Sequence, residues 1–273
     1  MRARPRHILL PTLLLLAAGG TSAGAQVRSA DRWLEQCRRD RGSGDEREQY
    51  CDVREQTIPA RANLRVDGRD NGGIEVIGWD RNEVLVRSKI QARSGSESDA
   101  KALADQIRID VGDEIRADGP STRWRSGWSV SYEIYAPRRT NLDLTANNGG
   151  ISIADVEGRI EFETTNGGVS LAGVAGDVRG STTNGGVDVE LTGNTWRGAG
   201  LDVRTTNGGI DVAIPEPYSA ELETGTVNGG MDIGFPVTVQ GRLNRRLTTR
   251  LGDGGPLVRI TTTNGGVTLR RAR

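Results

Sequence analysis

The chain of 273 residues is poor in the side chains that most often perform catalysis, with one histidine and two cysteines. His7 lies in an N-terminal segment that we expect to be removed, so the mature chain would contain no histidine. That excludes Ser-His-Asp and Cys-His nucleophile arrangements and a histidine-ligated zinc site. Cys37 and Cys51 lie in a chain that we expect to be exported. They are predicted to form a disulfide, which leaves no thiol for catalysis.

A long apolar run is also absent beyond the first residues. Residues 1–25 contain three arginines, the apolar run Ile8–Ala18 and a small-residue cleavage site ending at Ala25, an order typical of a secretory signal peptide. A membrane-spanning helix needs about twenty apolar residues, and this run is shorter. We therefore expect an exported mature chain that begins at Gln26, has no integral membrane segment, and lies in the periplasm, outside the cell or at its surface.

An excess of basic side chains is absent as well. The first 25 residues contain three arginines and no acid, so the remaining chain has about 33 basic and 36 acidic side chains, a net charge of about −3. A nucleic-acid partner is not expected, because such proteins present a basic surface. About 248 residues remain, which is enough for one large domain.

What the chain has instead is a repeat built on the tripeptide Asn-Gly-Gly. Its asparagines are Asn148, Asn166, Asn184, Asn207, Asn228 and Asn264. The positions six before, three after and five after each asparagine are apolar in every copy. The position between the last two is polar, so strand alternation is indicated on both sides of a tight turn. Repeats of about twenty residues indicate stacked units that bury their apolar faces only against one another.

Two architectures fit this pattern, and the sequence favours the first. In a parallel β-solenoid over residues 61–273, the asparagines form a hydrogen-bonded ladder from coil to coil. The first glycine of each tripeptide would supply a positive φ, and the second would let neighbouring backbones approach. The alternative is a meander or sandwich of antiparallel hairpins, because Asn-Gly between alternating apolar runs is also a strong hairpin signal.

Two helical regions are expected outside the repeat. Residues 26–60 form two charged stretches separated by Gly-Ser-Gly, each with one cysteine, and predict a disulfide-pinned helical segment that caps the first coil. Residues 97–107 predict a helix that covers a sheet face. Ser96 can cap its N-terminus, and its apolar residues fall on one side.

Candidate ligand-binding residues are few. Asp188, Asp211 and Asp232 occupy the polar position of three successive repeats, where stacked carboxylates would suit weak binding of Ca²⁺; no other cofactor is expected. The alternative is a solvent-exposed column of carboxylates whose charge is neutralised by nearby arginines.

Trp124 lies beside arginines in a loop, and Trp196 lies in an insertion between repeats. An exposed tryptophan with arginine can stack on sugars, so both are candidates for ligand binding.

Several segments resemble the putative-adhesin family of exported bacterial domains of unknown function: "NGGIEVIGWDRNEVLV", "YEIYAP", "TTNGGV" and "GDGGPLVRITTTNGGVTL". The resemblance covers about residues 60–270. It implies a β-solenoid in the cell envelope with an adhesive role, and it brings no catalytic residues. We therefore expect a non-enzymatic binding or scaffolding domain with an envelope protein or glycan as partner. The alternative is a polysaccharide lyase or hydrolase on a β-helix, which needs carboxylates that converge in a groove.

Overall fold

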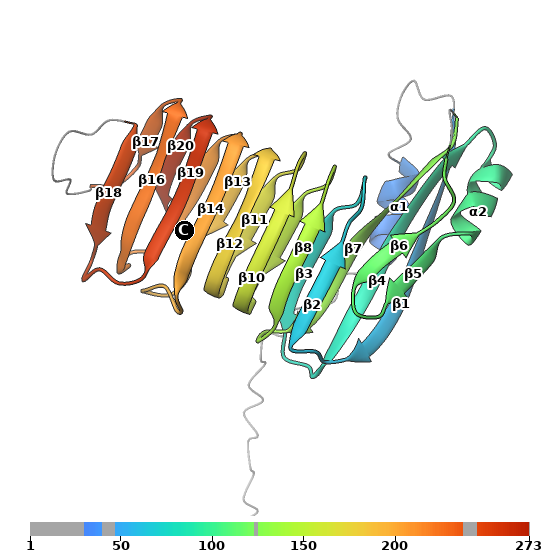
Figure 1. Cartoon of the computed structure of the whole chain (residues 1–273), viewed down its shortest axis with the longest axis horizontal. Helices are drawn as coiled ribbons and strands as arrows, with labels where there is room; N and C mark the ends of the chain where they lie inside the picture. The colour runs from blue at the N-terminus through green and yellow to red at the C-terminus, as the bar shows by residue number, and fades with distance from the viewer. Residues whose placement is uncertain (1–29, 40–46, 123–124, 237–244, 273) are drawn as a thin grey trace, which may run out of the picture.

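The computed structural model describes residues 30–39, 47–122, 125–236 and 245–272, and it contains two ten-stranded sheets (Figure 1). The predicted signal peptide lies outside the described residues. Sheet A contains, in spatial order, β1 (Glu48–Pro59), β4 (Glu83–Ser94), β7 (Gly127–Pro137), β3 (Ile74–Trp79), β9 (Ile151–Ala154), β11 (Val169–Ala172), β13 (Val187–Glu190), β15 (Ile210–Ile214), β20 (Val267–Arg271) and β17 (Met231–Ile233). Sheet B contains β18 (Arg246–Leu251), β16 (Ala220–Asn228), β19 (Leu257–Asn264), β14 (Gly200–Asn207), β12 (Ala175–Asn184), β10 (Glu157–Thr164), β8 (Asn141–Ala146), β2 (Asn63–Asp67), β6 (Ile115–Asp118) and β5 (Arg108–Val111).

Most neighbouring strands are parallel, because the chain alternates between the two sheets. It runs from β8 in sheet B to β9 in sheet A, and then to β10 and β11 in the same way. The strands on either side of an Asn-Gly-Gly tripeptide therefore lie in different sheets and pair with other repeats in parallel. This is a solenoid-like arrangement, and the hairpin meander is wrong.

The core lies between the two sheets. Apolar residues alternate with polar ones along most strands, and the inward apolar side chains of both sheets form the main core cluster. Ile77, Trp79 and Tyr135 of sheet A form a smaller, separate cluster. In one repeat, Val178 from sheet B and Val187 and Val189 from sheet A are all buried. Because the side-chain period of a strand is two, a slip of one residue would expose this whole set, so the apolar pattern fixes the register.

The asparagine side chains hydrogen-bond along the edge where the sheet B strands end. Asn166 Nδ2 donates to Asn148 Oδ1 at 2.7 Å, and Asn184 donates to Asn166 at 2.8 Å. Further bonds of 2.8 Å join Asn207 to Asn184 and Asn264 to Asn207.

The predicted roles of the two glycines differ from those observed. Gly185, a first glycine, does not have a positive φ. Its missing side chain matters for another reason, since a Cβ there would overlap the carbonyl oxygen of Gly167 in the neighbouring repeat. At the second glycine, Gly186, a Cβ would lie 3.5 Å from the carbonyl oxygen of Gly209, an ordinary contact distance. Close approach therefore belongs to the first glycine.

The last repeat is not at the end of the stack. Strand β19 lies between β14 and β16, and β20 lies between β15 and β17, so the C-terminal repeat is inserted between two earlier ones. Asn228 accordingly donates to Asn264 at 2.8 Å. Strand β18 pairs antiparallel with β16 and forms the edge of sheet B.

The N-terminal segment is half helix and half strand. Helix α1 (Ala30–Arg39) is followed by strand β1, so the prediction of helix in the second half of residues 26–60 is wrong. Strand β1 pairs antiparallel with β4 along twelve residues. The predicted disulfide between Cys37 and Cys51 is confirmed, and it joins α1 to β1.

Helix α2 (Glu97–Asp105) confirms the predicted covering helix. The Ser96 hydroxyl accepts a hydrogen bond of 3.1 Å from the Asp99 N–H and caps the helix. Ala100, Leu103 and Ala104 are buried against the sheet. In the described part of the chain, neither helix has the length and apolar character needed to span a membrane.

Candidate binding groove on the outer face of sheet A

A row of polar residues crosses the outer face of sheet A, one residue from each strand. The pairing register places them in the order Glu55, Arg87, Glu133, Glu75, Ser152, Ser170, Asp188, Asp211, Thr268 and Asp232. Neighbouring strands are about 4.8 Å apart, so each side chain is within reach of the next. This outer row includes all three of the aspartates predicted from the repeat.

The three predicted aspartates do not form one continuous column. Asp188 and Asp211 are neighbours, but Thr268 of the inserted repeat separates Asp211 from Asp232. The Asp211 carboxylate accepts a hydrogen bond of 2.7 Å from Arg270 Nε, which neutralises it. Among the described residues, no group of three or more acidic, cysteine or histidine side chains could hold a metal ion.

Part of the outer row forms the floor of a groove of about 500 Å³. The groove is bounded on one side by Trp33 of α1 and contains the charged side chains of Glu75, Lys89 and Asp188. Its floor is made of small residues, namely Ser131, Ser152, Ser170, Gly73, Gly150 and Gly168. We name this feature the sheet A groove. It places one aromatic ring beside serine hydroxyls and both signs of charge.

A buried ionic cluster fixes the charged end of the sheet A groove. Glu133 is 2% exposed, and its carboxylate contacts Arg87 Nη1 and Lys89 Nζ, each at 2.5 Å. The Tyr135 hydroxyl donates to Glu133 at 2.9 Å, and Glu55 contacts Arg87 Nε at 2.7 Å. Burial favours the neutral carboxyl, but the hydrogen bond and charge of Lys89, together with Tyr135 and Arg87, outweigh it and lower the pKa of Glu133.

The disulfide explains why Trp33 is held over sheet A. Cys37 lies one turn beyond Trp33 in α1, and its bond to Cys51 ties this turn to the edge strand β1. Gln49 strengthens the attachment, because its amide Nε2 donates to the Cys37 carbonyl oxygen at 2.6 Å.

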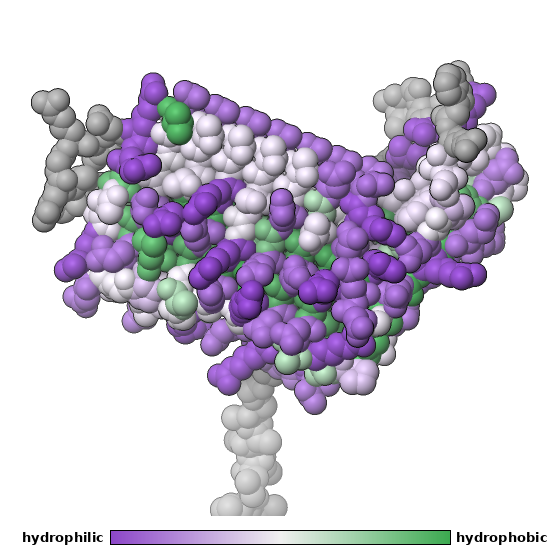
Figure 2. Space-filling view, in the orientation of Figure 1, coloured by the Kyte–Doolittle hydropathy of each residue, from purple (hydrophilic) through white to green (hydrophobic). Residues whose placement is uncertain are grey.

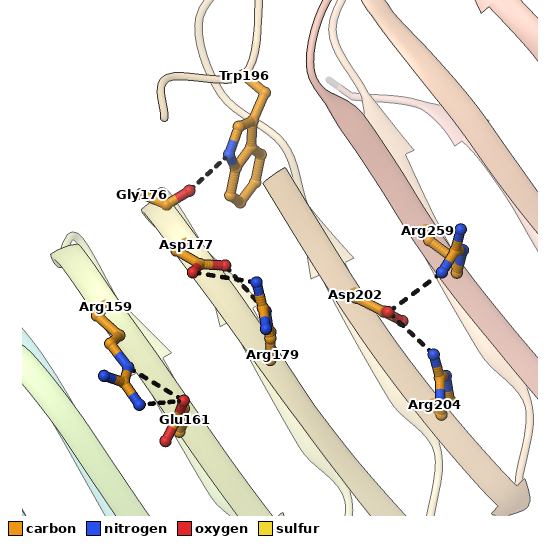
Figure 3. A network of polar contacts seen from close by, with 9 residues as sticks. All are labelled: Arg159, Glu161, Gly176, Asp177, Arg179, Trp196, Asp202, Arg204 and Arg259. Atoms are coloured by element: carbon orange, nitrogen blue, oxygen red, sulfur yellow. Dashed lines mark hydrogen bonds and ion pairs between the residues drawn. The ribbon is translucent and has the colours of Figure 1, made fainter. Parts of the chain in front are cut away.

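The two tryptophans predicted to bind ligand do not contribute to this groove. Trp124 lies outside the described residues. Trp196 is 4% exposed, and its indole N–H donates to the Gly176 carbonyl oxygen at 3.0 Å (Figure 3). Its ring is part of the core, so the prediction of Trp196 as a ligand-binding residue is wrong.

The groove residues that sequence reasoning missed are Trp33 and Lys89, because they are distant from the repeat along the chain. Only the fold brings α1 and β4 beside it. Ser152 and Ser170 did carry a signal, since they occupy the same repeat position as Asp188.

This chain is similar to several solved structures of bacterial proteins. A putative cell adhesion protein from Clostridium sporogenes is 13% identical, with a TM-score of 0.42; the match covers 81% of this chain and 100% of that one. A putative adhesin from Bacteroides fragilis is 10% identical, with a TM-score of 0.38, and covers 82% and 97%. A putative lipid binding protein from Parabacteroides distasonis is 12% identical, with a TM-score of 0.36, and covers 80% and 96%.

No curated protein matches this chain. The family model described as Toastrack DUF4097 matches residues 81–270, which include the strands from β4 onward. The protein therefore belongs to the Toastrack DUF4097 family.

Proposed function

We propose that this protein is a non-enzymatic, exported binding domain that holds a glycan of the cell envelope in the sheet A groove. The observation that carries the proposal is the position of Trp33 beside a floor of serines with Glu75, Lys89 and Asp188. Sugars bind where an aromatic face meets their C–H groups and a few fixed polar groups meet their hydroxyls. A volume of about 500 Å³ lies in the range of small-ligand sites.

The scaffold supports this proposal because it holds the floor of the groove rigidly. Ser152, Ser170 and Asp188 lie on adjacent strands in parallel register. We infer that the Asn-Gly-Gly tripeptides set the spacing of these strands through the asparagine side chains and the close glycine contacts. A site on paired strands keeps its geometry better than a site on loops, so less ordering free energy is lost on binding.

The test is binding of the purified mature chain to a panel of immobilised envelope glycans, including peptidoglycan fragments and surface polysaccharides. Ser170→Trp should fill the groove and abolish binding, and Trp33→Ala should weaken it by removing the aromatic face. The matched control is Thr183→Trp, which adds the same ring at an exposed position of sheet B. The proposal is wrong if no glycan is retained, or if Ser170→Trp binds as well as the control.

A further inference from the structure

A second groove, of about 410 Å³, lies on the opposite side of the molecule, on the outer face of sheet B. Figure 2 shows this face, where strongly hydrophilic side chains lie below a paler band near the strand ends. The residues that line it come from β14, β16, β18 and β19 and include Arg204, Arg245, Arg246, Arg259, Thr206, Thr226, Thr261 and Thr263. We name it the arginine groove.

Positive charge in the arginine groove exceeds the available acids. Asp202 is shared, because Arg204 contacts it at 3.0 Å and Arg259 at 3.4 Å (Figure 3). Arg259 also contacts Glu223 at 3.0 Å. Elsewhere on the same face the pairs are balanced, as in Arg159 with Glu161 at 2.8 Å. Four arginines and two acids therefore leave a local excess of about two positive charges.

The excess comes from the chain just before and at the start of β18, outside the repeat. The Arg245 guanidinium donates to the Val227 carbonyl oxygen at 2.8 Å, and within the described chain Arg246 has no ion pair. Arg246 pairs with Gly225 in the ladder, and a Cβ at Gly225 would lie 2.6 Å from the Arg245 carbonyl oxygen. A glycine is needed there, and it leaves the floor open between Arg246 and Arg204.

The buried threonine column of sheet B passes beneath the arginine groove and faces the core. The hydroxyls of Thr182 and Thr205 donate to glycine carbonyl oxygens of neighbouring repeats at 2.7 and 2.8 Å. Thr226 occupies the same repeat position and is 7% exposed, yet its hydroxyl has no hydrogen-bond partner among the described residues. The Thr226 hydroxyl oxygen is itself buried, so a ligand in the arginine groove would not reach it.

We propose that the arginine groove binds a sugar that carries a phosphate or sulfate ester. Guanidinium groups bind tetrahedral oxyanions through two parallel N–H donors, and no side chain among the described residues forms an ion pair with Arg246. The outward hydroxyls of Thr206, Thr261 and Thr263 supply partners for sugar hydroxyls, and the volume exceeds what a bare anion needs. This site is separate from the sheet A groove, so it does not depend on the function proposed there.

The test is calorimetric titration of the full mature chain with glucose 6-phosphate, glucose 6-sulfate and glucose, each at low and high salt. Both esters should bind and weaken with salt, and the tighter one identifies the natural ester. Arg246→Gln should weaken binding about tenfold, the equivalent of one charge-assisted hydrogen bond. Arg159→Gln removes the same charge from the same face and should leave binding unchanged. Absence of ester binding, or an equal loss in both variants, would overturn the proposal.

A threonine pair separates binding from stability. Thr261→Val should weaken ester binding without lowering the melting temperature, because its hydroxyl lies on the outer side of β19 in the groove and donates to no described residue. Thr205→Val should lower the melting temperature, because it leaves the Gly185 carbonyl oxygen without this donor. Unchanged ester binding in Thr261→Val would contradict the role of this hydroxyl. Ser170→Trp should bind the esters normally, which distinguishes failure of this site from failure of the sheet A groove.

Discussion

At the scale of single residues, the repeat depends on atoms that are missing as much as on those present. The first glycine of each tripeptide lets the next backbone come close, and the threonine two before the asparagine donates to a glycine carbonyl oxygen in the neighbouring repeat. Both contacts recur only if the spacing between strands is uniform. We therefore infer that the tripeptide specifies how neighbouring repeats fit, beyond making a turn within one repeat.

Gly185→Ala should lower the free energy of unfolding by about 1–3 kcal/mol, the usual cost of overpacking. The added methyl group would overlap the Gly167 carbonyl oxygen, and backbone atoms cannot move aside as a flexible side chain can. Gly186→Ala is the matched control and should change stability by less than about 0.5 kcal/mol. Urea unfolding of both variants measures the difference, and equal midpoints would show that close approach at the first glycine is not the constraint.

Glu133 should make stability depend on pH. Its folded pKa lies below its ordinary value of 4.5, so its contribution is fully present above about pH 4.5 and is lost as pH falls through the lowered folded pKa. Glu133→Gln leaves Arg87 and Lys89 without a buried carboxylate, which should cost about 3 kcal/mol at pH 7. When unfolding is measured from pH 7 to pH 3, the free energy of unfolding of the wild type should fall toward that of the variant. A difference in free energy that stays constant with pH would contradict this assignment.

At the scale of elements, the sequence predicted most of the strands of the repeat and helix α2, because alternation and capping are local signals. The second half of residues 26–60 was predicted as helix, but it forms strand β1, and the error has a physical reason. Residues 48–59 have charged side chains on both faces, so the apolar-polar alternation typical of a strand is missing. Glu55 of this segment pairs with Arg87 of β4 by an ion pair, which the sequence does not reveal. The sheet A groove could be predicted only in part, since Ser170 and Asp188 share a repeat position whereas Trp33 arrives from a distant helix.

The disulfide should control the attachment of α1 and hence the sheet A groove. Replacing Cys37 and Cys51 by alanine should remove about 3 kcal/mol of chain-entropy stabilisation for a loop of about fifteen residues. Because α1 lies at one end of the molecule, we expect faster hydrogen exchange in α1 with little change in β10 and β12. Wild-type protein treated with reductant is the control and should behave like the variant. Unchanged exchange in α1 would mean that packing alone holds the helix.

At the scale of the whole molecule, the order of the repeats was beyond the sequence. All six copies carry like residues at like offsets, so any copy could lie beside any other, and the simplest expectation is sequential stacking. The structure instead inserts the last copy between two earlier ones. The inserted repeat also creates the arginine groove, because Arg259 of β19 lies between Asp202 of β14 and Glu223 of β16.

Insertion of the last repeat changes what a C-terminal truncation should do. In a sequential stack, removing residues 256–273 would only uncover the preceding repeat. Here it removes β19 and β20, whose buried Val258, Ile260, Val267 and Leu269 contribute roughly 6–12 kcal/mol together. Strand β16 would lose its parallel neighbour, so its amides should exchange rapidly while those of β8 and β10 stay protected. A chain ending at residue 272 is the control, and continued protection of β16 in the truncated chain would show that the repeats stack in sequence order.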